Sequence, residues 1–141
     1  QISTLVSIRR HLSPDGTLIL HLEHLEMDWL GDLSGVFETV GSFSHPTTER
    51  QIRTSQAWSY ERASQNATCE TLWEELDTAG QVSDCWESRP LRFHCFFPFE
   101  VRHLLERTGF EIESLFGDFS EQQFNDNSSE MIWVATAPVT D

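Results

Sequence analysis

The segment Ile8-Arg-Arg-His-Leu-Ser-Pro-Asp-Gly-Thr-Leu-Ile-Leu20 decides the fold, because it joins a helix, a tight turn and a strand. Apolar residues at helical spacing lead into it, so we expect a helix to run from the first residues. Pro14 stops that helix, and Asp15 with Gly16 supplies a turn that contains a positive-φ position. Residues 17–24 are too continuously apolar for a half-exposed edge strand, which predicts a buried strand of a parallel sheet.

The last third of the chain shows a second helix and two further strands. Residues 98–108 have apolar side chains on one helical stripe, begin with proline and stop at Gly109, which predicts a helix. Residues 110–117 alternate as a strand, 120–130 are polar and predict a loop, and 131–136 form a final apolar strand. The expected order is helix, strand, loop, strand.

The middle of the chain predicts a small antiparallel sheet. Residues 26–45 contain scattered glycines and no clear period, so we expect a long loop with a short helical turn. Residues 51–62 alternate and predict a strand with one face covered, and 77–80 have the composition of a hairpin turn. The other segments expected to be extended are 69–76, 81–88 and 91–96.

Length, composition and charge exclude several classes of protein. The 141 residues are 38% hydrophobic and 23% charged, as expected of one globular domain. Nine Lys and Arg against 23 Asp and Glu give a net charge of −14, which repels nucleic acid and anionic membranes. No apolar run approaches the roughly 20 residues that span a bilayer. We therefore expect a soluble protein without a nucleic-acid or membrane partner.

Cysteine and motif content point to the cytoplasm and to chemistry without a metal. Cys69, Cys85 and Cys95 are too few and too widely spaced for a disulfide framework or a CxxC motif, which predicts free thiols in a reducing compartment. His21 and His24 are three residues apart, a spacing that sends them to opposite faces of a strand. No metal site is expected.

Three stretches in this order resemble the C-terminal half of a class I S-adenosylmethionine-dependent methyltransferase of the small-molecule type. The segment quoted first is similar to that family's helix, turn and fifth strand. Leu104-Leu-Glu-Arg-Thr-Gly-Phe-Glu-Ile112 is similar to its LLexaGFxv segment, and Met131-Ile-Trp-Val-Ala-Thr136 is similar to its terminal strand. The resemblance implies methyl transfer from S-adenosylmethionine to a small-molecule acceptor, by a longer chain of which this is a part.

The same resemblance implies an α/β fold. The chain would be the C-terminal part of a Rossmann-like methyltransferase sheet, strands five to seven, with the last two strands as an antiparallel hairpin. Residues 1–27 would hold the helix and fifth strand of the core, and 97–141 its last helix and the hairpin. Residues 28–96 would form a loop and a small antiparallel sheet, inserted on the substrate side.

The half of the family's fold that binds the cofactor has no counterpart in the sequence. Gly31, Gly35 and Gly41 do not follow a strand and open a helix, as a cofactor-binding Gly-rich loop would. No cofactor-binding residue is identifiable, so S-adenosylmethionine would be bound mainly by a missing N-terminal half, and the fragment alone is expected to be inactive. The strand at 17–24 would then present an unpaired edge, through which a homo-oligomer can form.

Five residues are candidates for the site. His24 follows the strand at 17–24, where open α/β sheets bind ligands, and an imidazole with a pKa near 6.5 can act as a base. It is the catalytic candidate and, with Glu26, a candidate for binding substrate. Trp29 and Trp58 can line an apolar pocket or face the sulfonium cation, and Arg92 can hold a carboxylate or phosphate.

Each of these hypotheses has an alternative. His24 can be a packed loop residue, Arg92 can pair with one of the many acids, and the aromatic residues can form the core of the small sheet. Methyl transfer can also proceed without a base, through proximity and orientation alone. The rival function is a non-catalytic α+β ligand-binding or interaction module with an aromatic cavity, which would have a closed or fully antiparallel sheet.

Overall fold

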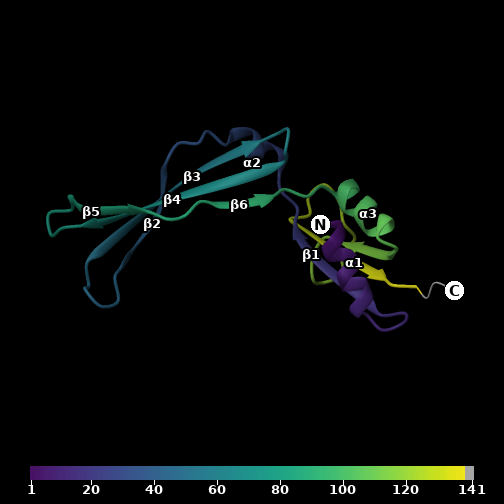
Figure 1. Ribbon diagram of the computed structural model, residues 1–141. Coiled ribbons are helices and arrows are strands. Elements are labelled where there is room, and N and C mark those ends of the chain that lie inside the picture. Colours follow the sequence, from purple (N-terminus) through teal and green to yellow (C-terminus); the bar gives the residue numbers. More distant parts are fainter. Residues whose placement is uncertain (139–141) are drawn as a thin grey trace. The chain divides into compact units, whose positions relative to one another are not determined.

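The computed structural model describes residues 1–138 and divides into two compact units (Figure 1). The first unit combines Gln1–Glu26 with the chain from Phe96 onward, and the second is Met27–Cys95. The chain therefore leaves the first unit after a strand and returns to it before a helix. None of the helices in residues 1–138 has the length and apolar character needed to cross a membrane.

The expected helix and turn at the start of the chain are confirmed. Helix α1 (Ile2–His11) ends just before Pro14, and Asp15 takes the left-handed conformation with φ of +58°. The amide of Gly16 donates a hydrogen bond to the Ser13 carbonyl oxygen at 2.8 Å. A Cβ atom at position 16 would lie 2.8 Å from that same oxygen, so the turn needs glycine there.

The sheet of the first unit has three strands, β1 (Thr17–Glu23), β7 (Glu111–Phe116) and β8 (Glu130–Thr136). Their order is β1-β8-β7, and β8 pairs antiparallel with both neighbours, which confirms the expected hairpin of the last two strands. Since β1 and β7 are each antiparallel to β8, they run in the same direction. The sheet therefore combines two co-directional strands with one reversed strand between them.

The prediction that residues 17–24 are buried is wrong, whereas the unpaired edge expected of this strand is confirmed within residues 1–138. Within residues 1–138, β1 pairs with β8 alone and is an edge strand whose residues alternate between exposed and half-buried. Ile19 is 66% exposed. The apolar pattern indicated a strand with both faces covered, but covering those faces requires neighbours that a strand's own sequence does not reveal.

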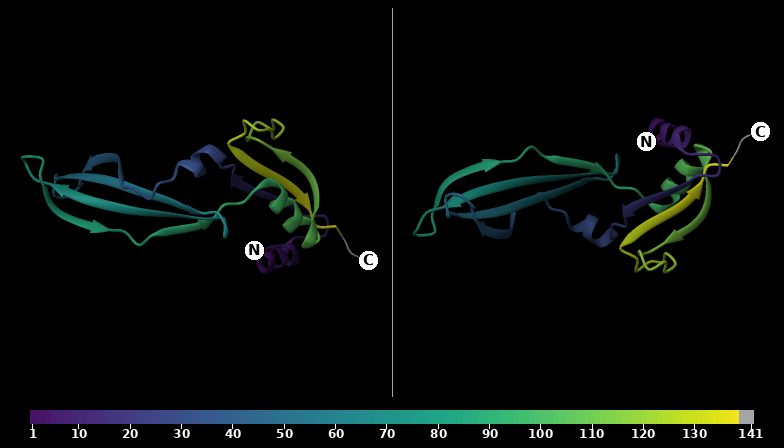
Figure 2. Two further views of the ribbon diagram at one scale, coloured as in Figure 1. Left: turned by 90° about the horizontal axis from the view of Figure 1, so that it is seen from above. Right: turned by 90° about the horizontal axis from the view of Figure 1, so that it is seen from below.

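The core of the first unit lies between the sheet and its helices. Helix α3 (Pro98–Arg107) packs against one face of the sheet with α1 beside it (Figure 2). Proline opens α3 and Gly109, with φ of +84°, follows its end, as the sequence predicts. The Arg9 Nε atom donates a hydrogen bond to the Gly109 carbonyl oxygen at 3.0 Å, which ties the two helices together. The buried core residues are Leu5, Val101, Leu105, Phe110, Met131, Trp133, Ala135 and Ala137.

The second unit is a short helix, α2 (Met27–Asp32), followed by a five-stranded antiparallel sheet. The strand order is β2-β3-β4-β5, and β6 pairs with the part of the β4 edge that β5 leaves free. The predicted hairpin at 77–80 is confirmed, since the Asp77 amide donates to the Gln81 carbonyl oxygen at 2.8 Å. The strands are β2 (Glu38–Ser44), β3 (Gln51–Glu61), β4 (Asn66–Leu76), β5 (Val82–Glu87) and β6 (Leu91–His94).

Two predictions for this sheet are wrong. The expected loop at 26–45 contains β2, whose residues are all exposed and therefore show no alternation between buried and polar positions. Strand β3 is not covered on one face only, because Ile52 is buried on one face while Ser55 and Ala57 are buried on the other. Ser55 lies in register between Thr39 and Leu72, so larger neighbours cover its small side chain.

An ion pair joins β3 to β4 across the sheet. The Arg53 guanidinium donates two hydrogen bonds to the Glu74 carboxylate, at 2.7 and 2.9 Å, and the two residues are direct cross-strand partners. The hydrogen bond to Arg53 lowers the pKa of Glu74, and the same bond raises the pKa of Arg53. Because the pKa of Glu74 is lowered in the folded state, its stabilising effect is present above the ordinary carboxyl pKa and is lost as the pH falls.

We predict that Glu74→Gln lowers the free energy of unfolding near neutral pH, and that the difference from wild type disappears in acid, well below the ordinary glutamate pKa of about 4.3. Urea denaturation at both pH values measures the effect. Glu70→Gln, at an exposed position of the same strand, is the control and should change little. An equal loss in both variants, or a loss independent of pH, would contradict the pairing.

We also predict that Leu105→Ala lowers the free energy of unfolding by about 2–5 kcal/mol, because it opens a cavity in the core of the first unit. The matched control is Phe99→Ala in the same helix, where the side chain is 75% exposed, and its effect should be small. Chemical denaturation followed by tryptophan fluorescence compares the two. Equal effects would show that α3 does not pack as described.

Candidate functional site

The five candidate residues are distributed over both units. His24 and Glu26 belong to the first unit, and Trp29, Trp58 and Arg92 belong to the second. Glu26 is exposed, while His24 is half-buried. The surroundings of these residues are described for each unit separately.

The ring of His24 is held in one orientation at the carboxyl end of β1. Its Nδ1 atom lies 2.7 Å from the Ser128 carbonyl oxygen, and its ring packs edge-on against Phe124 with centroids 4.8 Å apart. A carbonyl oxygen only accepts hydrogen bonds, so Nδ1 carries the proton in the neutral ring. Nε2 is then the nitrogen with a free lone pair, as a general base requires.

The loop that supplies Ser128 is built around Gly117. A Cβ atom at position 117 would lie 2.1 Å from the Ser128 Oγ atom, so the close approach of the two segments needs glycine. The same Oγ atom accepts a hydrogen bond from the Asn125 amide at 3.0 Å. Sequence reasoning predicted only a polar loop here and missed Phe124 and Ser128, since a backbone carbonyl partner leaves no signal in side-chain identity.

His21, within β1, has different partners. Its Nε2 atom lies 3.5 Å from a Glu130 carboxylate oxygen, and its ring packs edge-on against Phe119 at 5.0 Å between centroids. Across residues 1–138, no three His, Cys, Asp or Glu side chains gather to hold a metal ion. The histidines of this unit thus offer proton transfer, each in its own environment.

The aromatic candidates of the second unit pack on one another. Trp58 contacts Trp29 of α2 and Phe93 of β6, both in edge-to-face geometry, with centroids 5.5 and 5.9 Å apart. The Trp58 indole donates a hydrogen bond to the Gln56 side chain at 3.2 Å. These rings form a local aromatic cluster on one face of the sheet.

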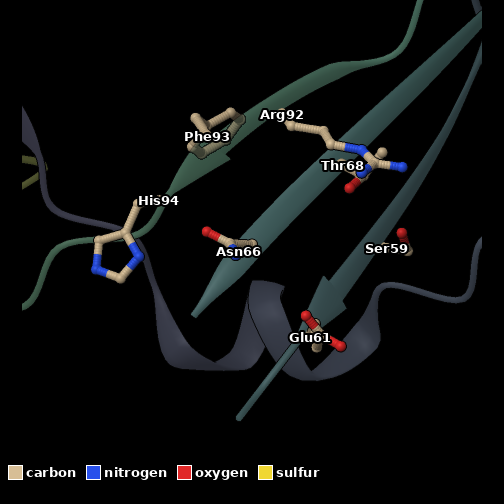
Figure 3. A pocket seen from close by; sticks show the side chains of 7 residues that line it. All are labelled: Ser59, Glu61, Asn66, Thr68, Arg92, Phe93 and His94. Carbon is tan, nitrogen blue, oxygen red and sulfur yellow. The ribbon is translucent and has the colours of Figure 1, made fainter. Parts of the chain in front are cut away.

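Arg92 lies on the opposite face of that sheet. It pairs in register with Thr68, whereas Trp58 pairs with the next residue of β4, Cys69, and successive residues of a strand point to opposite faces. Arg92 lines a cavity of about 470 Å³ on this polar face (Figure 3). The cavity is lined by Ser59, Glu61, Asn66, Thr68, Arg92, Phe93 and His94.

The Cys95 thiol is not an activated nucleophile. Burial raises the pKa of the Cys95 thiol, which keeps it protonated at neutral pH. Cys69 is also buried, Cys85 is exposed, and all three are free cysteines.

The described residues do not form a cradle of the kind that holds S-adenosylmethionine. Such a cradle would need a Gly-rich turn between a strand and the start of a helix. The turns that enter α2 and α3 are residues 24–26 and 95–97, and neither contains glycine. Neither of these two turns, within residues 1–138, therefore fits the cofactor.

No protein-family model and no curated protein sequence matches the chain significantly. Its structure, however, is similar to solved methyltransferases. An S-adenosylmethionine-dependent methyltransferase from Clostridium acetobutylicum matches with a TM-score of 0.70 and 9% identity, over 98% of this chain and 51% of that one. The CcbJ methyltransferase from Streptomyces caelestis matches with a TM-score of 0.67 and 18% identity, over 98% and 50%.

A third solved structure, CalS10 from Micromonospora echinaspora, is an amino pentose methyltransferase with S-adenosylmethionine bound, involved in calicheamicin biosynthesis. It matches with a TM-score of 0.56 and 18% identity, over 96% of this chain and 50% of that one. The chain thus spans about half the length of the solved structures it matches. Its fold is that of one half of an S-adenosylmethionine-dependent methyltransferase.

Proposed function

We propose that this chain is the C-terminal half of a class I S-adenosylmethionine-dependent methyltransferase that acts on a small molecule. The order β1-β8-β7 is the observation that carries the proposal. A further strand added parallel to the free edge of β1 would continue a mostly parallel sheet, in which β8 is the reversed strand. Strands β1, β7 and β8 then correspond to the fifth, sixth and seventh strands of that family, and Met27–Cys95 to its substrate-side insertion.

The cofactor would be held mainly by N-terminal residues outside this chain. S-adenosylmethionine, when bound, supplies a methyl group on a sulfonium centre. The turns that enter α2 and α3 contain no glycine, which supports the proposal that the N-terminal half binds the cofactor. The first unit then contributes residues that contact the acceptor.

His24 is the residue that we propose for proton transfer. An acceptor hydroxyl or amine loses a proton when it gains a methyl group, and the His24 Nε2 atom can take that proton. The hydrogen bond from Nδ1 to the Ser128 carbonyl and the contact with Phe124 keep the ring oriented for this step. Its place at the carboxyl end of β1 supports the assignment, because open α/β sheets bind ligands there.

Titration calorimetry with S-adenosylmethionine and S-adenosylhomocysteine tests the family assignment. We predict that the full open reading frame, if it extends upstream, yields a protein that binds both ligands, whereas the 141-residue chain binds neither or binds weakly. Circular dichroism on both proteins controls for folding. Absence of binding by the folded longer protein would overturn the assignment and favour a non-catalytic ligand-binding module.

A second prediction concerns the base. In the complete enzyme, His24→Gln should lower kcat by roughly 10²–10⁴-fold and flatten the acidic limb of its pH profile, while cofactor binding is unchanged. His21→Gln, within β1 and paired with Glu130, is the matched control and should retain activity. Wild-type kcat in the His24 variant would show that orientation alone drives the transfer.

A further inference from the structure

We propose that the polar cavity on the second unit is a binding site for a small carboxylate or phosphate that also carries hydroxyl or amine groups. The cavity lies entirely within Met27–Cys95, and six of its seven lining residues, all except Phe93, belong to the face of the sheet opposite Trp58. Its volume of about 470 Å³ is in the range of small-molecule sites, about 300–1,000 Å³.

The cavity is organised by two neighbouring rows of cross-strand partners. Ser59 of β3, Thr68 of β4 and Arg92 of β6 are in register and form the first row. The second row is offset by two residues on each strand and consists of Glu61, Asn66 and His94. Rows on one face of a sheet are about 7 Å apart along the strand, so a ligand of several heavy atoms can contact both.

Arg92 differs from the paired arginine on the same face of this sheet. Arg53 has the carboxylate of Glu74 as its direct cross-strand partner, whereas the partners of Arg92 in its row are two hydroxyl groups. Within residues 1–138 no hydrogen bond or ion pair involves the Arg92 side chain. In a chain with a net charge of −14, its guanidinium is a localised positive charge available to an anion.

The chemistry of the two rows defines the ligand. A planar guanidinium binds a carboxylate or phosphate through two parallel hydrogen bonds, and Ser59 and Thr68 can donate to the same anion. Figure 3 shows the Arg92 side chain extending toward Thr68, with Asn66 and Glu61 further along the sheet. The Glu61 carboxylate, which accepts a hydrogen bond from Ser64, attracts a hydroxyl or ammonium group and repels a second anion. The ligand therefore has one anionic end and one hydrogen-bond-donating end.

In the methyltransferase proposed above, this site would hold the anionic group of the acceptor. That assignment rests on the proposed function, whereas anion binding by the cavity does not. Binding is therefore measured on the 141-residue chain without S-adenosylmethionine, so that a failure here and a failure of methyl transfer are separate results.

The experiment is an NMR titration of the ¹⁵N-labelled chain with sn-glycerol 3-phosphate, D-gluconate and, as the uncharged control, glycerol. We expect one or both anions at millimolar concentration to shift the amides of Ser59, Thr68 and Arg92, while glycerol does not. The anion that binds more tightly distinguishes a phosphate ligand from a carboxylate ligand. Arg92→Gln should weaken binding roughly tenfold or more, since it removes a charge-assisted hydrogen-bond pair.

Arg89→Gln is the matched control, because Arg89 is exposed, lies three residues upstream and does not line the cavity. It should leave the affinity within about twofold of wild type. If Arg92→Gln alters the spectrum of the free protein, Thr68→Val tests the same row and should also weaken binding. No shift with either anion, or an equal loss in the Arg89 and Arg92 variants, would overturn the proposal.

Discussion

The first unit depends on the burial of β8 between two strands and beneath its helices. Met131, Trp133 and Ala135 are buried on the face that α1 and α3 cover, so the most hydrophobic strand is also the central one. Because β8 pairs with both β1 and β7, those two strands must run in the same direction and end at the same edge. Packing of one strand thus places the carboxyl ends of the other two together.

That edge is where the unit holds a histidine together with the groups that orient its ring. His24 follows β1, and the loop after β7 returns through Gly117 to bring the Ser128 carbonyl to the imidazole. The hydrogen bond selects one tautomer and leaves Nε2 free. The sequence placed His24 only near the end of a strand. The folded unit also fixes the orientation of its ring, so that Nε2 is the atom that can accept a proton.

In the second unit, aromatic and polar side chains lie on opposite faces of the sheet, because successive residues of a strand point to opposite faces. Trp58 and Phe93 lie on one face with Trp29, and Arg92 lies on the other with hydroxyl and amide side chains. The sequence grouped Trp58 and Arg92 as parts of one substrate site. The register excludes a shared face, because their partners Cys69 and Thr68 are neighbours on β4.

The sequence by itself determined the elements whose causes are local. Pro14 and Gly16 set the first turn, Pro98 and Gly109 bound α3, and the hairpin turn at 77–80 follows from its residues. Only the tertiary structure decided that one face of β1 is exposed, that exposed β2 is a strand, and that the Ser128 carbonyl orients His24. These features depend on which segments become neighbours in the fold. Backbone partners, register and exposure are properties of a pair of segments, and the sequence of one segment alone does not determine them.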